Sequence, residues 1–461
     1  MTPQAPELVQ LDVDEIRKQV TGAVIVPGDA DYDAARTVML GGVDVHPALI
    51  VRVAGTDDVR AVIALARDSG LELAVRSGGH SGAAHSTTEG GIVLDVRDLD
   101  ALEIDEDERT AWAGSGLTAG AYTIAAAERG LATGFGDTGS VGLGGITTGG
   151  GIGYLVRKHG LTIDSLLAAE VVTADGVVHL VDDTHEPDLF WAIRGGGGNF
   201  GVVTRFKFRL HPLPSIVGGI LVLPAAAETI AGFMAAAATA PDELSTIANV
   251  MPCPPMPFVP EDQHGQVVIL ALLCWSGPAE AGEAALAPFR ALATPVADLL
   301  HAGPYTEMYP PEDADYHPLA IQQTLFLDSF DRTIAQTILV HLDASDAAMR
   351  VAQLRALGGA MARVDADATA FAHRDRAFMV SVATFYESEH DRAARDAWVR
   401  GLARALHQRD GVYVNFLEDE GPARVREAYP GRTWDRLVEL KRRYDPENLF
   451  RRNQNIPPAS R

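Results

Sequence analysis

Cysteine is nearly absent from this sequence of 461 residues, in which only Cys253 and Cys274 occur. Two cysteines are too few for a disulfide framework or a cysteine-based zinc site, so neither is expected. Clusters of Lys and Arg with interleaved aromatic residues are also missing, and the formal net charge is -24. Because phosphate backbones are bound by basic side chains, nucleic acid is not an expected partner.

Long apolar runs are absent as well. No uninterrupted apolar stretch is long enough to span a bilayer, and the first residues lack the basic and apolar regions of a secretory signal. We therefore expect a cytoplasmic protein without a membrane partner. The chain is longer than one hydrophobic core usually serves, so at least two domains are expected.

Glycine, in contrast, is abundant and clustered. Three clusters lie in the first half of the chain, at residues 75–86, 134–153 and 194–210, and ten of the twenty residues in the second cluster are glycine. Glycine is used where a positive φ or a very close backbone approach is required. Loops of this kind expose backbone N–H groups that bind anions. The clusters therefore predict a cofactor that carries a pyrophosphate.

The Rossmann fingerprint for such a cofactor is not present. The nearest match, "GLGGIT", places Thr147 where the third glycine belongs, and it lies far beyond the first predicted strand. A nicotinamide-dependent Rossmann dehydrogenase is therefore the weaker alternative.

The order of predicted elements suggests a discontinuous domain. Residues 48–81 read as strand, helix, strand and glycine loop, with Thr56 as the helix N-cap and Gly70 as its C-terminal stop. From about Leu213 the sequence changes to Ala- and Pro-rich stretches with strands such as "QVVILALLCW" and "QQTLFLDSF", and after Gly411 "VYVNF" reads as a further strand. The predicted partition is a first domain at 1–210, with its recognisable part at about 45–213, an inserted domain at 211–404, and a returning segment at 405–461.

His80 is the most informative residue of the first glycine cluster. It lies among Gly78, Gly79, Ser81 and Gly82, in a loop of residues that allow close approach. A neutral imidazole nitrogen is a competent nucleophile. The arrangement suits a ring presented to a flat ligand whose phosphates lie on the adjacent amides.

Five stretches, in order, resemble the flavin-linked oxidases of the berberine-bridge-enzyme type, in the vanillyl-alcohol-oxidase superfamily. They are "VRSGGHS", "GLGGITTGGGIGYLVRKHGLTIDSL", "VVTADG", "DLFWAIRGGGGNFGVVT" and "YVNF…YDPENLFRRNQNIPP". The resemblance covers about residues 45–210 and 405–458. It implies an α+β fold: a PCMH-type FAD-binding domain of two subdomains, with an inserted α+β substrate domain whose antiparallel sheet is covered by helices.

The resemblance also implies how FAD is held. His80 matches the histidine that bonds covalently to the 8α-methyl of the flavin. The other positions that match cofactor-binding residues are Arg76, Ser77, Gly78, Gly79 and Ser81 for the pyrophosphate, Gly142, Gly144, Gly145, Gly149, Gly150, Gly151 and Gly153 in the second loop, Val203 near the adenine half, and Tyr413, Asn415 and Asn455 near the isoalloxazine.

Three positions depart from the family pattern. Thr138 stands where many members have a second, cysteinyl tether, so the resemblance implies attachment through His80 alone. Ile146 stands where bicovalent members have a histidine that faces the flavin C2=O. Phe416 replaces the second tyrosine of a "Y-x-N-Y" run, which many plant members use as the base.

The implied activity is that of an oxidase in secondary metabolism. It takes a hydride from a hydroxylated or amine-bearing small molecule onto the flavin, and O2 is the electron acceptor that gives H2O2. Tyr413 and Tyr386 are the candidate bases, although Tyr413 is equally well explained as a core tyrosine with a satisfied hydroxyl. Asn249, Gln322 and Tyr386 are candidate substrate ligands.

Two further alternatives stay open. The hydroxyl of Thr138 beside the flavin favours a monooxygenase that acts on a natural-product precursor through a flavin-N5-oxygen adduct. The loss of a tyrosine at Phe416 is also compatible with a flavin-binding protein that has no catalytic activity.

Overall fold

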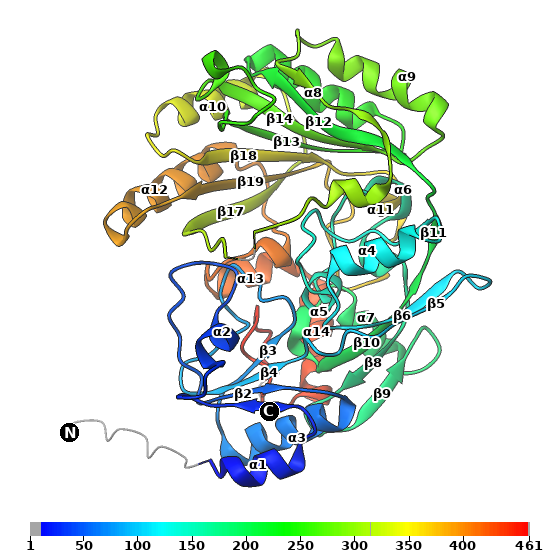
Figure 1. Cartoon of the computed structure of the whole chain (residues 1–461), viewed down its shortest axis with the longest axis vertical. Coiled ribbons are helices and arrows are strands. Elements are labelled where there is room, and N and C mark those ends of the chain that lie inside the picture. The colour runs from blue at the N-terminus through cyan, green and yellow to red at the C-terminus, as the bar shows by residue number, and fades with distance from the viewer. Residues whose placement is uncertain (1–10, 314, 460–461) are drawn as a thin grey trace.

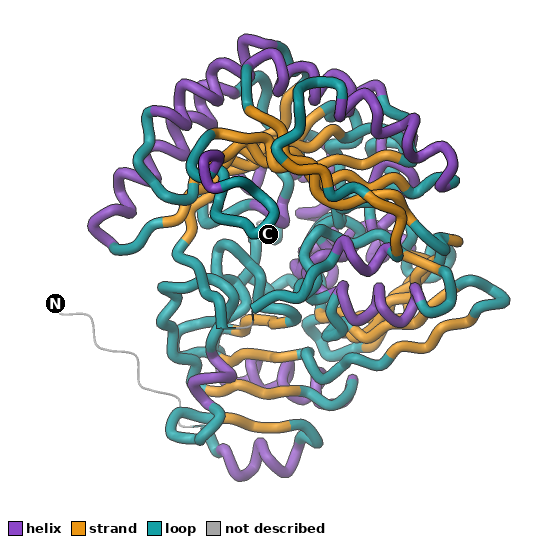
Figure 2. The backbone as a smooth tube through the Cα atoms, turned by 45° about the horizontal axis from the view of Figure 1, so that its top comes forward, coloured by secondary structure: helices purple, strands orange, loops and turns teal. Residues whose placement is uncertain are grey.

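The computed structural model describes residues 11–313 and 315–459. Helices and open sheets occur together along the chain, which confirms the α+β class. Two smaller sheets lie in the lower half of the molecule, and an eight-stranded sheet with helices on its outer side lies above them (Figures 1 and 2).

The first sheet has four strands in the order β1-β2-β4-β3, and only β1 runs antiparallel to its neighbour. Its strands are β1 (Ala23–Ile25), β2 (Leu49–Arg52), β3 (Leu73–Arg76) and β4 (Ile92–Asp95). Helix α3 (Thr56–Ser69) joins β2 to β3, as the sequence predicts, and ends at Gly70 with φ 70°. The predicted N-cap is wrong, because Gly55 occupies that position and the Thr56 hydroxyl instead donates to Glu170.

The second sheet has five antiparallel strands in the order β5-β6-β10-β8-β9. They are β5 (Leu102–Asp105), β6 (Thr110–Gly114), β8 (Leu166–Val172), β9 (Val178–Val181) and β10 (Val202–Arg209). The C-terminal segment packs into the same core, where Val412, Tyr429 and Ile456 are buried with Phe206. A predicted strand in this segment is wrong, because "VYVNF" contains no strand and its last three residues form the 3-10 helix η5 (Val414–Phe416).

A buried ion pair joins the C-terminal segment to the third glycine loop. Lys441 is fully buried, and its ammonium donates to the Asp445 carboxylate at 2.7 Å and to the carbonyls of Asn199 and Phe450 at 2.8 Å. A buried ammonium is tolerated only when it is paired and hydrogen-bonded, as here. Lys441 therefore joins the C-terminal segment to 3-10 helix η2 (Gly197–Asn199).

The upper sheet is antiparallel, in the order β15-β12-β14-β13-β18-β19-β17, with β16 paired to β12. Its strands are β12 (Ile216–Pro224), β13 (Leu244–Pro252), β14 (Val267–Trp275), β15 (Ala297–Asp298), β16 (His301–Gly303), β17 (Ala320–Leu327), β18 (Arg350–Ala356) and β19 (Phe378–Phe385). The outer helices are α8 (Ala227–Thr239), α9 (Ala279–Arg290), α10 (Arg332–Asp343) and α12 (Glu389–Leu406).

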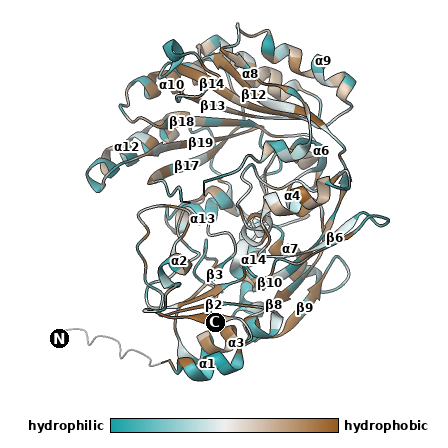
Figure 3. Cartoon of the chain, in the orientation of Figure 1, coloured by the Kyte–Doolittle hydropathy of each residue, from teal (hydrophilic) through white to brown (hydrophobic). Residues whose placement is uncertain are grey.

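The upper sheet buries one face under these helices. Phe233, Leu342 and Leu402 pack from the helices against the strands, while α12 keeps much hydrophilic surface outside (Figure 3). Side chains alternate between the two faces of a strand, so the remaining residues of each strand face the lower half of the molecule. That second face includes polar side chains.

The remaining helices and short strands connect and flank these sheets. They are α1 (Val13–Gln19), α2 (Tyr32–Arg36), α4 (Ala119–Ala127), β7 (Leu131–Ala132), α5 (Leu143–Thr148), α6 (Val156–His159), η1 (Thr162–Asp164), α7 (Pro187–Ile193), β11 (His211–Pro212), η3 (Glu261–Gln263), η4 (Tyr305–Met308), α11 (Ala360–Arg363), α13 (Pro422–Ala428) and α14 (Arg432–Tyr444). Within the described ranges, none of the helices has the length and apolar character needed to cross a bilayer.

Candidate active site

A cavity of about 510 Å³ lies between the glycine loops and the polar face of the upper sheet. Residues 77–81 after β3 and several residues between 136 and 148 form one side of it. The start of β10 and the C-terminal segment form a second side, and β17, β18 and β19 close it from above. One cavity is therefore lined by all three parts of the predicted partition.

The first two glycine clusters touch each other backbone to backbone. A Cβ on Gly142 would lie 2.1 Å from the Ser77 Oγ, and one on Gly78 would lie 2.3 Å from the Gly142 nitrogen. The Ser77 hydroxyl donates to the Ser115 carbonyl at 2.7 Å and accepts from the Gly144 N–H at 3.3 Å. Larger residues would separate the two loops, so glycine is required at the contact.

His80 projects from this contact into the cavity. Its Nε2 lies 3.0 Å from the Ser140 Oγ. Burial lowers the pKa of His80, so the imidazole is neutral at pH 7 and one ring nitrogen keeps a free lone pair. The ring has the protonation state that a nucleophile needs.

Tyr413 lies behind the cavity wall instead of on it. Its hydroxyl oxygen accepts from the Gly151 N–H and from the Asn415 amide, both at 2.9 Å. Burial raises its pKa to about 12. The Asn415 amide also donates to the Ile146 carbonyl at 3.1 Å. The geometry matches the alternative of a core tyrosine, which holds the second glycine loop in place through Asn415.

A polar network covers the cavity from above. The Arg355 guanidinium donates to the Asp137 carboxylate at 2.6 Å and to the Gln353 amide oxygen at 2.6 Å. Gln353 in turn donates to the Asn249 amide oxygen at 3.0 Å. Gln353 and Arg355 are alternate residues of β18, so both project from the same face. Arg355 also lies 5.4 Å from the centroid of the Phe416 ring, which lines the cavity.

The cavity wall includes many of the residues singled out from the sequence. These are Ser77, Gly78, Gly79, His80, Ser81, Thr138, Gly142, Gly144, Gly145, Val203, Gln322 and Asn415. They come from segments far apart in the chain, so the fold brings the predicted set together at one place.

Other residues singled out from the sequence do not line the cavity. Arg76 is buried and turned away, because its guanidinium donates to the carbonyls of Ala35 and Arg36. Tyr386 is half-buried and lies beside Arg392. The residues absent from the wall are Arg76, Gly149, Gly150, Gly151, Gly153, Asn249, Tyr386, Tyr413 and Asn455.

The four glycines in that group are packing residues. A Cβ on Gly149 would lie 1.8 Å from the Asn415 Oδ1, and one on Gly151 would lie 1.9 Å from the Thr162 Oγ1. A Cβ on Gly153 would lie 1.8 Å from the Phe135 carbonyl oxygen, while Gly150 has φ 127°. Asn249 likewise does not line the cavity. It accepts a hydrogen bond from Gln353, which does.

Sequence reasoning missed Asp137, Gln353 and Arg355, and it missed the contact of Ser140 with Glu312. A signal existed for the strand residues, because "RVAQLRA" places polar side chains at alternate positions between apolar ones. No local signal pairs Asp137 with Arg355 or Ser140 with Glu312, since the partners are far apart in the chain.

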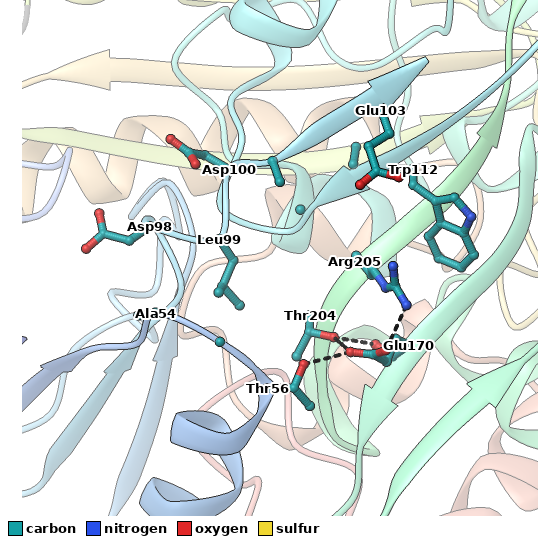
Figure 4. A pocket seen from close by; sticks show the side chains of 14 residues that line it. Ala54, Thr56, Asp98, Leu99, Asp100, Glu103, Trp112, Glu170, Thr204 and Arg205 are labelled. Carbon is teal, nitrogen blue, oxygen red and sulfur yellow. Dashed lines mark hydrogen bonds and ion pairs between the residues drawn. The ribbon is translucent and has the colours of Figure 1, made fainter. Parts of the chain in front are cut away.

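A second hollow, of about 370 Å³, lies between α3 and the five-stranded sheet. Its Glu170 carboxylate accepts from the hydroxyls of Thr56 and Thr204 at 2.7 Å and from Arg205 at 3.1 Å (Figure 4). The Arg205 guanidinium also covers the Trp112 ring, 4.7 Å from its centroid. These charged groups are used within the fold, where the Thr56 hydroxyl bond joins the start of α3 to the five-stranded sheet.

Two family descriptions match the chain. The family "FAD binding domain" matches residues 47–182, and "Berberine and berberine like" matches residues 412–457. The (R)-6-hydroxynicotine oxidase of Paenarthrobacter nicotinovorans is 30% identical over 95% of this chain and 97% of that protein. The uncharacterized FAD-linked oxidoreductase YvdP of Bacillus subtilis is 32% identical over 96% of this chain and 99% of that protein.

Solved structures with the same fold superpose on the chain. The crystal structure of 6-hydroxy-D-nicotine oxidase from Arthrobacter nicotinovorans superposes with a TM-score of 0.84, at 29% identity over 95% of this chain and 98% of that one. A chitooligosaccharide oxidase superposes with a TM-score of 0.83 at 22% identity, over 97% of this chain and 100% of that one, and so shares the fold.

Proposed function

The chain belongs to the family of FAD-linked oxidoreductases that end in a berberine-like segment, and from this premise we propose that it is an oxidase of a hydroxylated or amine-bearing small molecule. Relatives are named for the oxidation of 6-hydroxynicotine and of chitooligosaccharides, which supports an alcohol or amine substrate. When bound, FAD supplies a hydride acceptor that passes its electrons to O2 and yields H2O2. The observation that carries the proposal is the single cavity shared by His80, the glycine loops and the polar sheet face.

The residues of the cavity fit FAD. A Cβ placed on Gly145 or Gly198 would meet no protein atom within 4 Å, although both residues lie on the cavity wall. Space is therefore left beside two glycine loops for something other than protein. Ser77, Gly78 and Gly79 would hold the pyrophosphate on their backbone N–H groups, as glycine loops do.

We assign covalent attachment to His80 alone. It is a neutral ring on the wall, beside the contact of the two glycine loops, and Thr138 on the same wall offers a hydroxyl where a cysteinyl tether would need a thiol. Cys253 and Cys274 are both buried in the upper part of the fold and do not line the cavity. The proposed division of the chain follows: residues 1–210 and 405–461 hold the cofactor, and residues 211–404 supply the substrate face.

Asp137 is the proton acceptor in this proposal. Among the described residues that line the cavity it is the one carboxylate, and its other titratable neighbours on the wall are His80, His85, Arg355 and Arg452. Burial lowers the pKa of His85 to about 4, which makes that imidazole a weak base. Arg355 fixes one oxygen of Asp137 and leaves the second for a substrate hydroxyl or ammonium.

The activity is tested by a peroxide-release screen with alcohols, sugars, hydroxylated rings and amines. A substrate should bleach the flavin without oxygen and release one H2O2 per molecule oxidised in air. Incorporation of an oxygen atom from labelled O2, with less peroxide than product, would show the monooxygenase alternative instead. A protein that holds FAD but is bleached by no compound of the panel would contradict an oxidase function.

Filling the space at Gly145 should weaken FAD binding. Gly145→Val adds a side chain that enters the cavity, and overpacking of this kind costs about 1–3 kcal/mol. We expect the dissociation constant for FAD to rise roughly tenfold or more, by the equivalence of about 1.4 kcal/mol with a factor of ten. Flavin fluorescence titration in a His80→Ala background measures it without interference from a covalent bond.

Gly401→Val is the matched control, because Gly401 lies in α12, away from the cavity, and also has no atom within 4 Å of its would-be Cβ. Equal affinities of the two variants for FAD would show that the space beside Gly145 is not the cofactor's.

A further inference from the structure

Glu312 reaches His80 through Ser140. The Glu312 carboxylate accepts from the N–H groups of Gly139 and Ser140, at 2.7 and 3.1 Å, and from the Ser140 hydroxyl. The same hydroxyl oxygen lies 3.0 Å from the His80 Nε2. Glu312 precedes β17 and belongs to the segment inserted between the two cofactor-binding parts of the sequence. Three residues from three distant segments thus form one chain of hydrogen bonds.

The groups in this series of hydrogen bonds can donate and accept in one arrangement only. An ionised carboxylate only accepts, so the Ser140 hydroxyl must give its single proton to Glu312. The Ser140 oxygen then has only lone pairs left for His80, so the Nε2 must carry the imidazole proton and donate it. A neutral imidazole has one N–H, and therefore Nδ1 holds the free lone pair. No hydrogen bond among the described residues ends on this Nδ1.

We propose that Ser140 and Glu312 are positioning residues for cofactor attachment: they hold His80 in the tautomer whose Nδ1 bonds to the flavin, and they accept its proton. This inference rests on the proposed tether at His80. In hydrolase triads, too, a hydrogen bond to one ring nitrogen fixes the tautomer and the orientation of the imidazole.

In the attachment step a bond forms between His80 Nδ1 and the 8α-carbon, and one C–H bond of that methyl group breaks. The Nε2 proton passes to the Ser140 oxygen while the Ser140 proton passes to Glu312, and the methyl proton leaves to solvent. Two electrons go to the isoalloxazine ring and from there to O2, which becomes H2O2. Glu312 is exposed, so it can release its proton to water.

The first test needs only the wild-type protein. The flavin peptide is isolated after proteolysis, and its NMR spectrum shows which imidazole carbons couple to the 8α-methylene protons. Substitution at Nδ1 gives couplings to Cε1 and the quaternary Cγ, whereas substitution at Nε2 gives couplings to Cε1 and Cδ2. We expect the Cγ coupling. A Cδ2 coupling would overturn the inference.

The second test measures the rate of attachment. Full-length protein produced under riboflavin limitation is mixed with FAD in air, and acid-stable flavin is followed with time. Removal of a positioned proton acceptor typically costs about 10²-fold or more, and we expect slowing of that order for Glu312→Gln and Ser140→Ala. Glu312→Asp should recover part of the rate, which a purely structural role would not predict.

Glu307→Gln is the matched control, because this nearby glutamate pairs with His301 and makes no contact with His80. Non-covalent FAD binding, measured before acid is added, shows that each variant is folded. Unchanged attachment rates in Glu312→Gln and Ser140→Ala would overturn the inference while the tether stands. A wild-type protein without any acid-stable flavin would instead contradict the proposed tether.

Discussion

His80→Ala is expected to remove all acid-stable flavin and yet leave a protein that binds FAD reversibly. His80 offers the neutral ring nitrogen at the cavity wall, and alanine offers no nucleophile. The glycine contacts between Gly78 and Gly142 do not involve the imidazole, so the loops that receive the pyrophosphate stay in place. Intact-protein mass spectrometry should show a loss equal to one FAD, and acid-precipitated protein should be colourless.

His85→Ala provides the comparison. His85 is also a neutral histidine on the cavity wall, five residues further along, so its removal changes composition and burial in a similar way. We expect this variant to keep its acid-stable flavin. If the His80 variant retains the FAD mass, or if the His85 variant loses it, the tether is not at His80.

Local patterns were enough to predict the unit of strand, helix and strand that ends in the first glycine loop. Val59, Val62 and Ile63 recur at helical spacing, and they do pack α3 on the four-stranded sheet. The same kind of reasoning failed at "VYVNF", where alternation suggested a strand. There the Tyr413 hydroxyl and the Asn415 amide bond to each other and to the second glycine loop, and these tertiary contacts stabilise a 3-10 turn.

The sequence likewise predicted one part of the candidate site and not the other. The glycine loops are local features that carry the resemblance to the family, and this resemblance placed His80, Ser81 and Gly145 beside a cofactor; all three line the cavity. Ion pairs between residues far apart in the sequence could not be predicted. Asp137 and Arg355 meet only because β18 lies above the second glycine loop. Arg76 does not line the cavity although its neighbours in sequence do, because its guanidinium donates to the carbonyls of Ala35 and Arg36.

Asp137→Asn is expected to slow substrate oxidation by about 10²- to 10⁴-fold, the usual contribution of a positioned general base. Asparagine keeps the size of the side chain and an oxygen for Arg355, but its amide cannot take a proton. The effect should therefore appear in kcat more than in KM, with the substrate found by the peroxide screen. Stopped-flow bleaching of the flavin without oxygen measures the reductive step alone.

Asp242→Asn separates chemistry from folding. Asp242 also pairs with an arginine, Arg363 at 2.6 Å, but it does not line the cavity. Since exposed ion pairs contribute little to stability, this variant should bleach at the wild-type rate. If Asp137→Asn bleaches as fast as Asp242→Asn, then Asp137 does not accept the substrate proton. His85 is then the next candidate among the titratable rings on the wall. An undiminished rate in both Asp137→Asn and His85→Ala would mean that hydride transfer needs no protein base, as expected for a neutral amine substrate.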